Sequence, residues 1–366
     1  MTGPSHRRGQ GRSRRNTAGA RRAAFTLIEL LVVVAVLALL ISLLLPAIGS
    51  VRQTARQVVC ASNLRQVTLA INTYGNEYKD WIVGSPEGSG SAVAESPARF
   101  NGIAIQLYDF IGPLAHHMGM EGPGEGQSNP TDMDRAARYD WYRNIGMFTC
   151  PSNNITAAPW RESSPPPYWT TGRMNSYNMS TQFTTSTKPF PLGTGFWQNQ
   201  NRSRYTPLLS KLGISTSMKA AAFDGHRYAF WNEAPDYDWR LEAPDGGAFQ
   251  GVGPAWAQSK ELNRMLAPGE AGNALGGIPG LTVFDARTWA FRHGTKRDGT
   301  ITRTQVYGNV AFFDGHVTLM SDGEATNPDM WFPGGTILKN QANWFNRYAR
   351  DKWPQKCGIG GDYEVP

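Results

Sequence analysis

The strongest pattern in the chain is a continuous apolar run over residues 25–48. This run is 24 residues long and contains three polar residues, Thr26, Glu29 and Ser42. A helix of that length measures about 36 Å, because each residue adds about 1.5 Å, and the hydrocarbon core of a bilayer is about 30 Å thick. The pattern therefore predicts a transmembrane helix. Because a carboxylate near hydrocarbon costs a few kcal/mol, Glu29 is expected to have a partner.

The following segment, residues 49–78, is amphipathic. Its apolar residues recur at spacings of three and four, which places them along one face of a helix. They are Val51, Ala55, Val58, Val59, Leu64, Val67, Ala70, Ile71 and Tyr74. We expect one helix from about Thr26 to Tyr74, bent at Pro46, where a backbone donor is missing. Its first half is expected to pack against lipid or other chains, and its second half against the globular domain of the same chain.

Residues 1–24 carry a dense positive charge and no acidic residue. Their seven arginines are Arg7, Arg8, Arg12, Arg14, Arg15, Arg21 and Arg22. By the positive-inside rule this basic leader stays in the cytoplasm and the chain beyond the apolar run is exported. The other 29 basic residues equal the 29 acidic ones in number. The pI near 9.3 is therefore a property of the leader, and we expect no nucleic-acid partner.

The start of the apolar run resembles the N-terminus of type IV prepilins and type II secretion pseudopilins. The matching residues are Phe25–Leu31, the apolar run itself and Pro46. The resemblance implies that prepilin peptidase cleaves between Ala24 and Phe25 and methylates the new amine. It also implies that Glu29 pairs with the amino terminus of a neighbouring pilin-like subunit. Ala24 stands where the family usually has Gly, so a small residue is kept before the cleavage site.

Two simpler interpretations of residues 25–48 remain. A plain membrane anchor accounts for everything except Glu29 and the prepilin-like string. A secretory signal peptide has a shorter apolar core and a small-x-small cleavage site, and residues 46–49 are a poor example of such a site.

Further strings resemble a subfamily of large prepilin-like proteins whose C-terminal region is named for a His followed by Asp-Gly. They include Cys60–Gln66 and Leu69–Tyr74, and, within about 281–320, Arg292-His293 and Asn309–Val317. Twenty residues separate His293 from Asp314, whereas the subfamily pattern has about nine. Residues 296–304 look like an inserted hairpin tip, which accounts for the longer spacing between His293 and Asp314.

Residues 79–366 have the composition of a loop-rich domain. All 12 Trp and most of the 40 Gly and 24 Pro residues lie there, and about 290 residues can bury a sizeable core. This composition indicates an α+β or mostly β domain rather than a helical bundle. Combined with the resemblance, it predicts a pilin-like α+β fold, in which a long N-terminal helix packs on a loop-rich antiparallel sheet.

Two Asp-Gly strings lie between β-prone segments, Asp224-Gly225 and Asp314-Gly315. Asp-Gly between two strands is a strong hairpin signal, because a type I′ turn needs positive φ at both central residues. We therefore predict two hairpin turns. The alternative is a metal site formed by Asp224, His226, Asp314 and His316. Because nothing in the spacing demands a metal, we expect none.

The chain contains three cysteines, Cys60, Cys150 and Cys357, which could form a disulfide in an oxidising compartment. The exported side is oxidising, so a disulfide is allowed, and a Cys60–Cys150 bridge would pin the helix to the domain. The alternative is that the thiols are unpaired or paired differently; an odd count leaves one over within a chain.

Catalytic and cofactor signals are weak. The chain has no G-x-S-x-G, H-E-x-x-H, P-loop or paired C-x-x-C motif, which argues against an enzyme. We expect no cofactor. Calcium is the one alternative, held by acids in a Gly-rich loop, namely Glu121, Glu125, Asp132 and Asp134.

The sequence thus predicts a single-pass protein of the bacterial inner membrane with its C-terminal domain exported. The predicted role is that of a structural subunit of a pilus or type II secretion pseudopilus. The alternative from another class is an exported glycan-binding protein that uses the helix only as a tether. Glu29 separates the two, since a tether has no use for an acid.

Overall fold

The structure is a computed structural model that describes residues 26–85, 99–100, 103–104, 110–120, 141, 144–153, 156–157, 172–173, 175–184, 205–225, 250–251, 292–293, 307–338, 345 and 347–366. The chain forms two units, Met1–Val51 and Arg52–Pro366. One helix, α1, contributes residues to both units.

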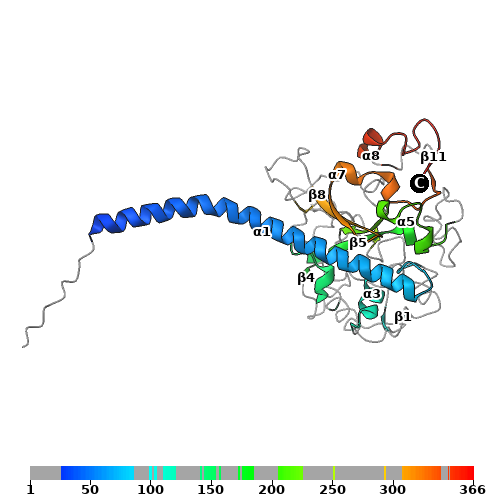
Figure 1. Ribbon diagram of the computed structural model, residues 1–366, viewed down its shortest axis with the longest axis horizontal. Coiled ribbons are helices and arrows are strands. Elements are labelled where there is room, and N and C mark those ends of the chain that lie inside the picture. The colour runs from blue at the N-terminus through cyan, green and yellow to red at the C-terminus, as the bar shows by residue number, and fades with distance from the viewer. Residues whose placement is uncertain are drawn as a thin grey trace, which may run out of the picture. The chain divides into compact units, whose positions relative to one another are not determined.

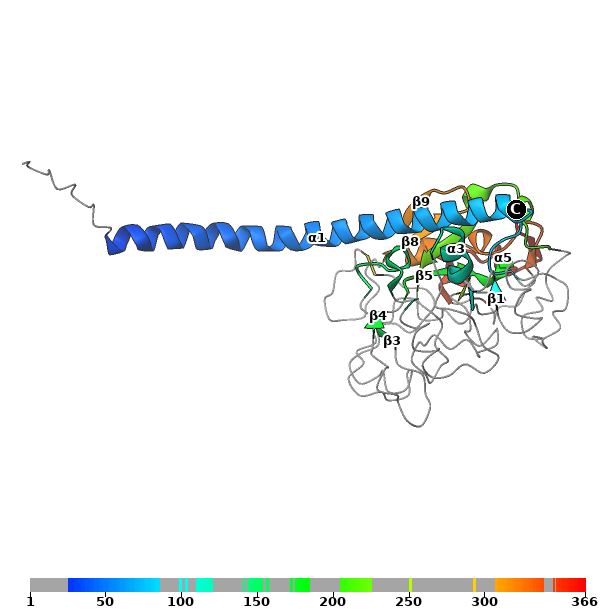
Figure 2. The same cartoon turned by 90° about the horizontal axis from the view of Figure 1, so that it is seen from below.

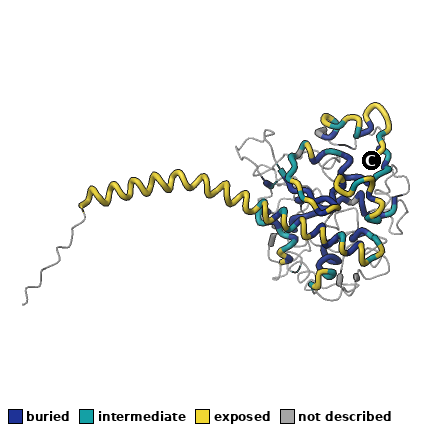
Figure 3. The backbone as a smooth tube through the Cα atoms, viewed as in Figure 1, coloured by how far each residue is buried: buried dark blue, intermediate teal, exposed yellow. Residues whose placement is uncertain are grey.

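Helix α1 comprises Leu27–Glu77 and includes Pro46, so the expected single helix is confirmed. In the first unit its described side chains are exposed (Figure 3). Within the described residues, α1 is the helix long and apolar enough to cross a membrane. In the second unit, one face of α1 is buried, with Leu64, Val67 and Tyr74 fully so. The change from exposed to buried follows the change from uniformly apolar to amphipathic sequence.

The second unit is built on a five-stranded sheet with the order β7-β5-β6-β8-β9. The strands are β5 (Tyr177–Ser180), β6 (Ala220–Asp224), β7 (Gln250–Gly251), β8 (Tyr307–Phe312) and β9 (Val317–Ser321). Strands β5, β6, β8 and β9 pair antiparallel with their neighbours in the sheet. Strand β7 lies at the edge and pairs parallel with β5. A long N-terminal helix with an antiparallel sheet confirms the predicted α+β, pilin-like fold.

The sheet buries both of its faces. On one face, Ala222 and Ala311 pack with the buried stripe of α1, and α1 lies along that side of the strands in Figure 2. On the other face, Phe223 and Val310 pack with C-terminal residues that include Trp331. Because strands alternate their side chains between faces, two clusters arise from the same pair of strands. A register shift between Ala220 and Ala222 is the irregularity by which Ala221 and Ala222 both join the α1 side.

Short elements complete the described part of the second unit (Figure 1). The helical ones are α3 (Ile111–His117), η1 (Gly146–Phe148), α5 (Thr181–Thr184), η2 (Leu209–Lys211), η3 (Thr216–Met218), α7 (Asp322–Ala325), η5 (Pro328–Met330) and α8 (Arg347–Lys352). Three antiparallel pairs are β1 (Arg99–Phe100) with β2 (Ile103–Ala104), β3 (Thr156–Ala157) with β4 (Gly172–Arg173), and β10 (Ile337–Leu338) with β11 (Tyr363–Glu364).

Candidate functional site

The N-terminus of α1 is capped by hydrogen bonds between Thr26 and Glu29. The backbone N–H of Thr26 donates to Glu29 Oε2 at 2.9 Å, and the Thr26 hydroxyl donates to the same oxygen at 2.8 Å. In return, the Glu29 N–H donates to Thr26 Oγ1 at 3.3 Å. This reciprocal arrangement is a capping box, which satisfies amides that have no partner within the helix. Glu29 therefore has a partner within its own chain.

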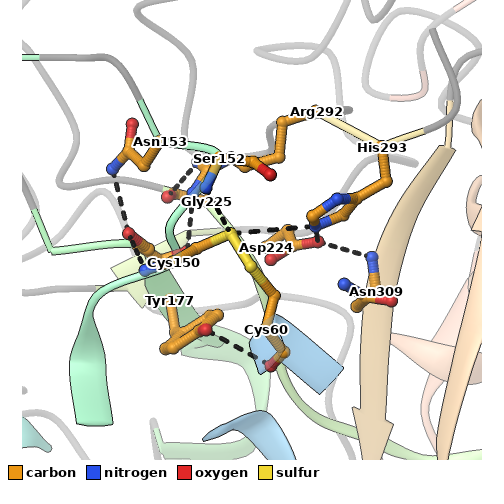
Figure 4. A network of polar contacts seen from close by, with 11 residues as sticks. Cys60, Cys150, Ser152, Asn153, Tyr177, Asp224, Gly225, Arg292, His293 and Asn309 are labelled. Carbon is orange, nitrogen blue, oxygen red and sulfur yellow. Dashed lines mark hydrogen bonds and ion pairs between the residues drawn. A yellow bond between two sulfur atoms is a disulfide. The ribbon is translucent and has the colours of Figure 1, made fainter. Parts of the chain in front are cut away.

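A disulfide between Cys60 and Cys150 ties the buried part of α1 to the segment after η1, with Cα atoms 5.0 Å apart. Both cysteines are fully buried. Two hydrogen bonds flank the bridge: the Asn63 amide donates to Thr149 O at 3.2 Å, and the Tyr177 hydroxyl donates to Cys60 O at 3.2 Å. The helix is thus attached to strand β5 as well as to the loop that carries Cys150 (Figure 4).

A buried histidine and aspartate lie beside this disulfide. His293 Nε2 is 3.1 Å from Asp224 Oδ2, with both side chains fully buried, and 3.8 Å from Cys150 Sγ. Asp224 Oδ2 also accepts a hydrogen bond from the Asn309 N–H at 2.7 Å. The backbone of His293 is fixed by two hydrogen bonds with Tyr307, at the start of β8. Figure 4 shows one nitrogen of the imidazole facing both the carboxylate of Asp224 and the sulfur of Cys150.

Hydrogen bonds to Ser176 connect it to the segments that lie next to it in the fold. The Ser176 hydroxyl oxygen accepts from the Cys150 N–H at 2.8 Å and from the Asn153 side-chain amide at 3.0 Å. The Gly225 N–H donates to Ser176 O at 2.8 Å, and the Arg292 guanidinium donates to Gly225 O at 2.6 Å. Four segments distant in sequence, around Cys150, Ser176, Gly225 and Arg292, therefore meet at the edge of the sheet.

The interior around this cluster disfavours charge. Burial, with a smaller contribution from the nearby Asp224 carboxylate, raises the pKa of Tyr177 far above its ordinary value. The tyrosine therefore acts as a neutral hydrogen-bond donor. In such surroundings an ionised Asp224 needs close polar partners, and the imidazole and the Asn309 N–H are two of them.

The comparisons with known proteins divide the chain into two matched regions. Residues 19–45 match the family described as the prokaryotic N-terminal methylation motif. This match covers the leader boundary, the capping box and most of the apolar run. The chain is a prepilin-like protein. Residues 49–224 match a second family, described as a protein of unknown function (DUF1559). Neither a curated protein nor a solved structure matches the chain.

The comparisons leave part of the N-terminal and C-terminal predictions open. Ala24 and Phe25, the residues of the expected cleavage site in this prepilin-like protein, lie outside the described residues. The matched region that ends at residue 224 does not extend to the His-and-Asp-Gly region of about 281–320, so that resemblance stays a prediction. The acids proposed for calcium, Glu121, Glu125, Asp132 and Asp134, lie outside the described residues.

The prediction of a hairpin turn at Asp224-Gly225 is wrong. Asp224 belongs to strand β6, where it pairs with Tyr177 of β5. Gly225 continues this pairing through its hydrogen bond to Ser176 O, and its φ is not positive. The backbone stays extended because its polar groups find partners on β5, and the Asp224 carboxylate reaches across to Asn309 on β8. His226 lies outside the described residues.

Asp314-Gly315 does lie in a hairpin, between β8 and β9, but the turn is not of type I′. Gly315 has a φ of 94°, and Asp314 is not among the described residues with positive φ. The Gly315 N–H donates to Phe312 O at 2.8 Å, and the Phe312 N–H donates to His316 O at 2.9 Å. The loop therefore contains three residues, with glycine in the last position, where positive φ is required.

Of the alternative metal site, the three residues that the structure describes, Asp224, Asp314 and His316, are not brought together. Asp314 pairs with His316 Nδ1 at 2.6 Å on the partly exposed hairpin, whereas Asp224 lies in the buried cluster with His293. The sequence singled out His293 only through the resemblance, and with Asp314 rather than Asp224. The contributions of Ser176 and Tyr177 were missed, because no spacing in the sequence links them to the cluster. Arg292 was named only as part of the same resemblance as His293.

Proposed function

We propose that this prepilin-like protein is a structural subunit of a pilus or type II secretion pseudopilus-like fibre. Residues 25–48 insert it into the inner membrane, prepilin peptidase cleaves between Ala24 and Phe25, and residues 79–366 form the exported domain. Other pilin-like subunits are its assembly partners. The match of residues 19–45 to the methylation motif supports the processing step, and the apolar helix α1 supports the single membrane span.

The single observation that carries the proposal is the environment of Glu29. It is the one acidic residue in the stretch 25–48, and its carboxylate oxygen Oε2 accepts both hydrogen bonds from Thr26. Thr26 would be the second residue of the cleaved chain. The acid is therefore held close to the position at which cleavage creates an amine. In a fibre, the amine of a neighbouring subunit supplies a full positive charge, which local N–H and O–H donors do not.

The exposed apolar side chains of the first half of α1 support assembly through this helix. Leu27, Ile28 and Leu31 are each at least two-thirds exposed. In a membrane such side chains contact lipid, and in a fibre they contact the helices of other subunits. A membrane tether needs the apolar surface as well, but it gains nothing from an acid in the first helical turn.

The deciding experiment compares the chain in bacterial cells with and without a functional prepilin peptidase. N-terminal mass spectrometry of the membrane fraction should find a chain that begins at a methylated Phe25 only when the peptidase is active. Mechanical shearing should then release the processed chain in a high-molecular-mass fraction. A chain that begins at Met1, or after Ala47, in peptidase-positive cells would contradict the processing step. A correctly processed chain that never appears in the sheared fraction would contradict the fibre and favour the tether.

A further inference from the structure

Three potential metal ligands meet in the cluster described above. Cys60 Sγ, Cys150 Sγ and one ring nitrogen of His293 lie within 4.8 Å of one another, and all three residues are buried. Asp224 Oδ2 lies 3.1 Å from His293 Nε2. None of these groups comes from a local sequence motif, since they lie on α1, after η1, before β8 and at the end of β6. The fold alone brings them together.

We propose that, in its dithiol form, the chain binds one zinc-class divalent cation through Cys60, Cys150, His293 and Asp224. The cation and the disulfide exclude each other, because the sulfur atoms that bond to one another in the oxidised chain would bond to the metal in the reduced chain. Every chain is synthesised with thiols, so the metal-binding form precedes the disulfide.

The distances suit a tetrahedral ion. With Zn–S near 2.3 Å and Zn–N or Zn–O near 2.0–2.2 Å, neighbouring ligand atoms lie roughly 3.3–3.8 Å apart. Cys150 Sγ and His293 Nε2 are 3.8 Å apart, at the upper end of this range. His293 Nε2 and Asp224 Oδ2 are 3.1 Å apart, slightly closer than the range, and would move apart as the ion binds. Cleavage of the disulfide frees the two sulfurs to separate. Two thiolates with an imidazole and a carboxylate favour zinc over magnesium or calcium.

One unsatisfied atom points independently to a further group at this site. Among the residues that the structure describes, Asp224 Oδ1 is buried and has no hydrogen-bond partner. Buried polar atoms are nearly always satisfied, and a buried carboxylate needs a close positive charge. A divalent cation beside Asp224 would supply that charge. Arg292, whose guanidinium binds the oxygen of the adjacent Gly225, would offset the remaining negative charge of two thiolates and one carboxylate.

Conversion of the oxidised chain to the metal-bound chain takes two steps. A dithiol reductant converts the Cys60–Cys150 disulfide into two thiols and is itself oxidised to a cyclic disulfide. The divalent cation then replaces the two thiol protons, so that two metal–sulfur bonds form and two protons are released for each ion bound. His293 binds as the neutral imidazole through Nε2, with its remaining proton on Nδ1.

The experiment titrates Co²⁺ into the full-length chain in detergent micelles, with the disulfide either intact or reduced under anaerobic conditions. A Cys357→Ser background removes the third cysteine, which lies in the other hydrophobic cluster. We expect one Co²⁺ per reduced chain, a thiolate-to-cobalt charge-transfer band, the release of about two protons and displacement by Zn²⁺. The oxidised chain should show none of these.

Variants assign the ligands. Cys150→Ser should abolish the charge-transfer band. Asp224→Asn should weaken Co²⁺ binding by at least about 10- to 100-fold, the range found when only the hydrogen-bond partners of metal ligands are changed. His316→Asn, on the exposed hairpin, is the matched control and should leave the titration unchanged. Failure of the reduced, otherwise unmutated chain to give the band would overturn the proposal without any variant. A band that survives in a Cys60→Ser, Cys150→Ser double variant would overturn it as well.

Discussion

His293 Nε2 lies 3.1 Å from Asp224 Oδ2, with neither side chain accessible to solvent. This pair joins the segment before β8 to the end of β6 and lies directly against the Cys60–Cys150 disulfide. It is the point at which helix α1, the sheet and the C-terminal region of the chain meet. Its environment differs sharply from that of the second His–Asp pair, His316 with Asp314, which lies on a partly exposed hairpin.

Because one His–Asp pair is buried and the other is partly exposed, we expect mutations in them to lower the free energy of unfolding by very different amounts. Asp224→Ala removes the acceptor used by His293 and by the Asn309 N–H, and leaves both buried without it. We expect a loss of about 3–5 kcal/mol in the free energy of unfolding, as when one partner of a buried pair is removed. His316→Ala, the matched control, should cost at most about 1 kcal/mol. Denaturant unfolding of the full chain in detergent measures both; equal effects would contradict the structural role of the buried pair.

The loop between β8 and β9 predicts a conformational cost at Gly315. Its φ of 94° is a conformation that β-branched residues avoid, while the nearest atom to an added Cβ, Leu69 Cδ2, is at an ordinary 3.7 Å. The strain of Gly315→Val is therefore conformational rather than steric, and should amount to about 1–2 kcal/mol. Gly146→Ala is the control, because its φ is ordinary and no atom lies within 4 Å of the added Cβ. A Gly315→Val variant as stable as the control would contradict the required positive φ.

The contrast between the two Asp-Gly strings shows how far the sequence could predict the site. Local patterns were sufficient for α1, for the β-rich second unit and for the hairpin at Asp314-Gly315, because periodicity and a glycine with positive φ are local properties. The same dipeptide at Asp224-Gly225 is part of a strand. There the decision is made by partners remote in sequence, Ser176 for the backbone and Asn309 for the carboxylate. No local pattern encodes such partners, and for the same reason the His293–Asp224 pair was not predicted.

Buried Lys219 predicts a specific dependence of stability on pH. Its ammonium donates to Asp329 O at 3.0 Å and to the main-chain oxygen of Pro366 at 2.8 Å, yet burial lowers the pKa of Lys219 from 10.5 to about 8. Between those two pH values the unfolded chain binds more protons than the folded chain, so the contribution of Lys219 to stability rises with pH. The gain across this window is on the order of 3 kcal/mol.

The test of that prediction follows the free energy of unfolding from pH 7 to pH 10.5 in the unmutated chain and in Lys219→Met. The difference between the two chains removes the contribution of the other titrating groups. It should shift in favour of the unmutated chain as the pH rises above about 8. Lys211→Met, which removes a lysine at the end of η2, serves as the control. A difference that stays constant over the whole range would show that the pKa of Lys219 is not lowered.

The capping box at the start of α1 separates two roles of Glu29. A glutamine can replace glutamate in a capping box, because its side-chain oxygen still accepts from the N–H and hydroxyl of Thr26. It cannot form an ion pair with the amine of a neighbouring subunit. If the charge serves assembly, Glu29→Gln and Glu29→Ala should both reduce the sheared fibre fraction at least tenfold, while membrane insertion and cleavage before Phe25 stay unchanged. Thr26→Ser, which keeps the hydroxyl, is the matched control and should assemble normally. Fibres at the unmutated level from Glu29→Gln, with none from Glu29→Ala, would mean that the acid serves only to cap its own helix.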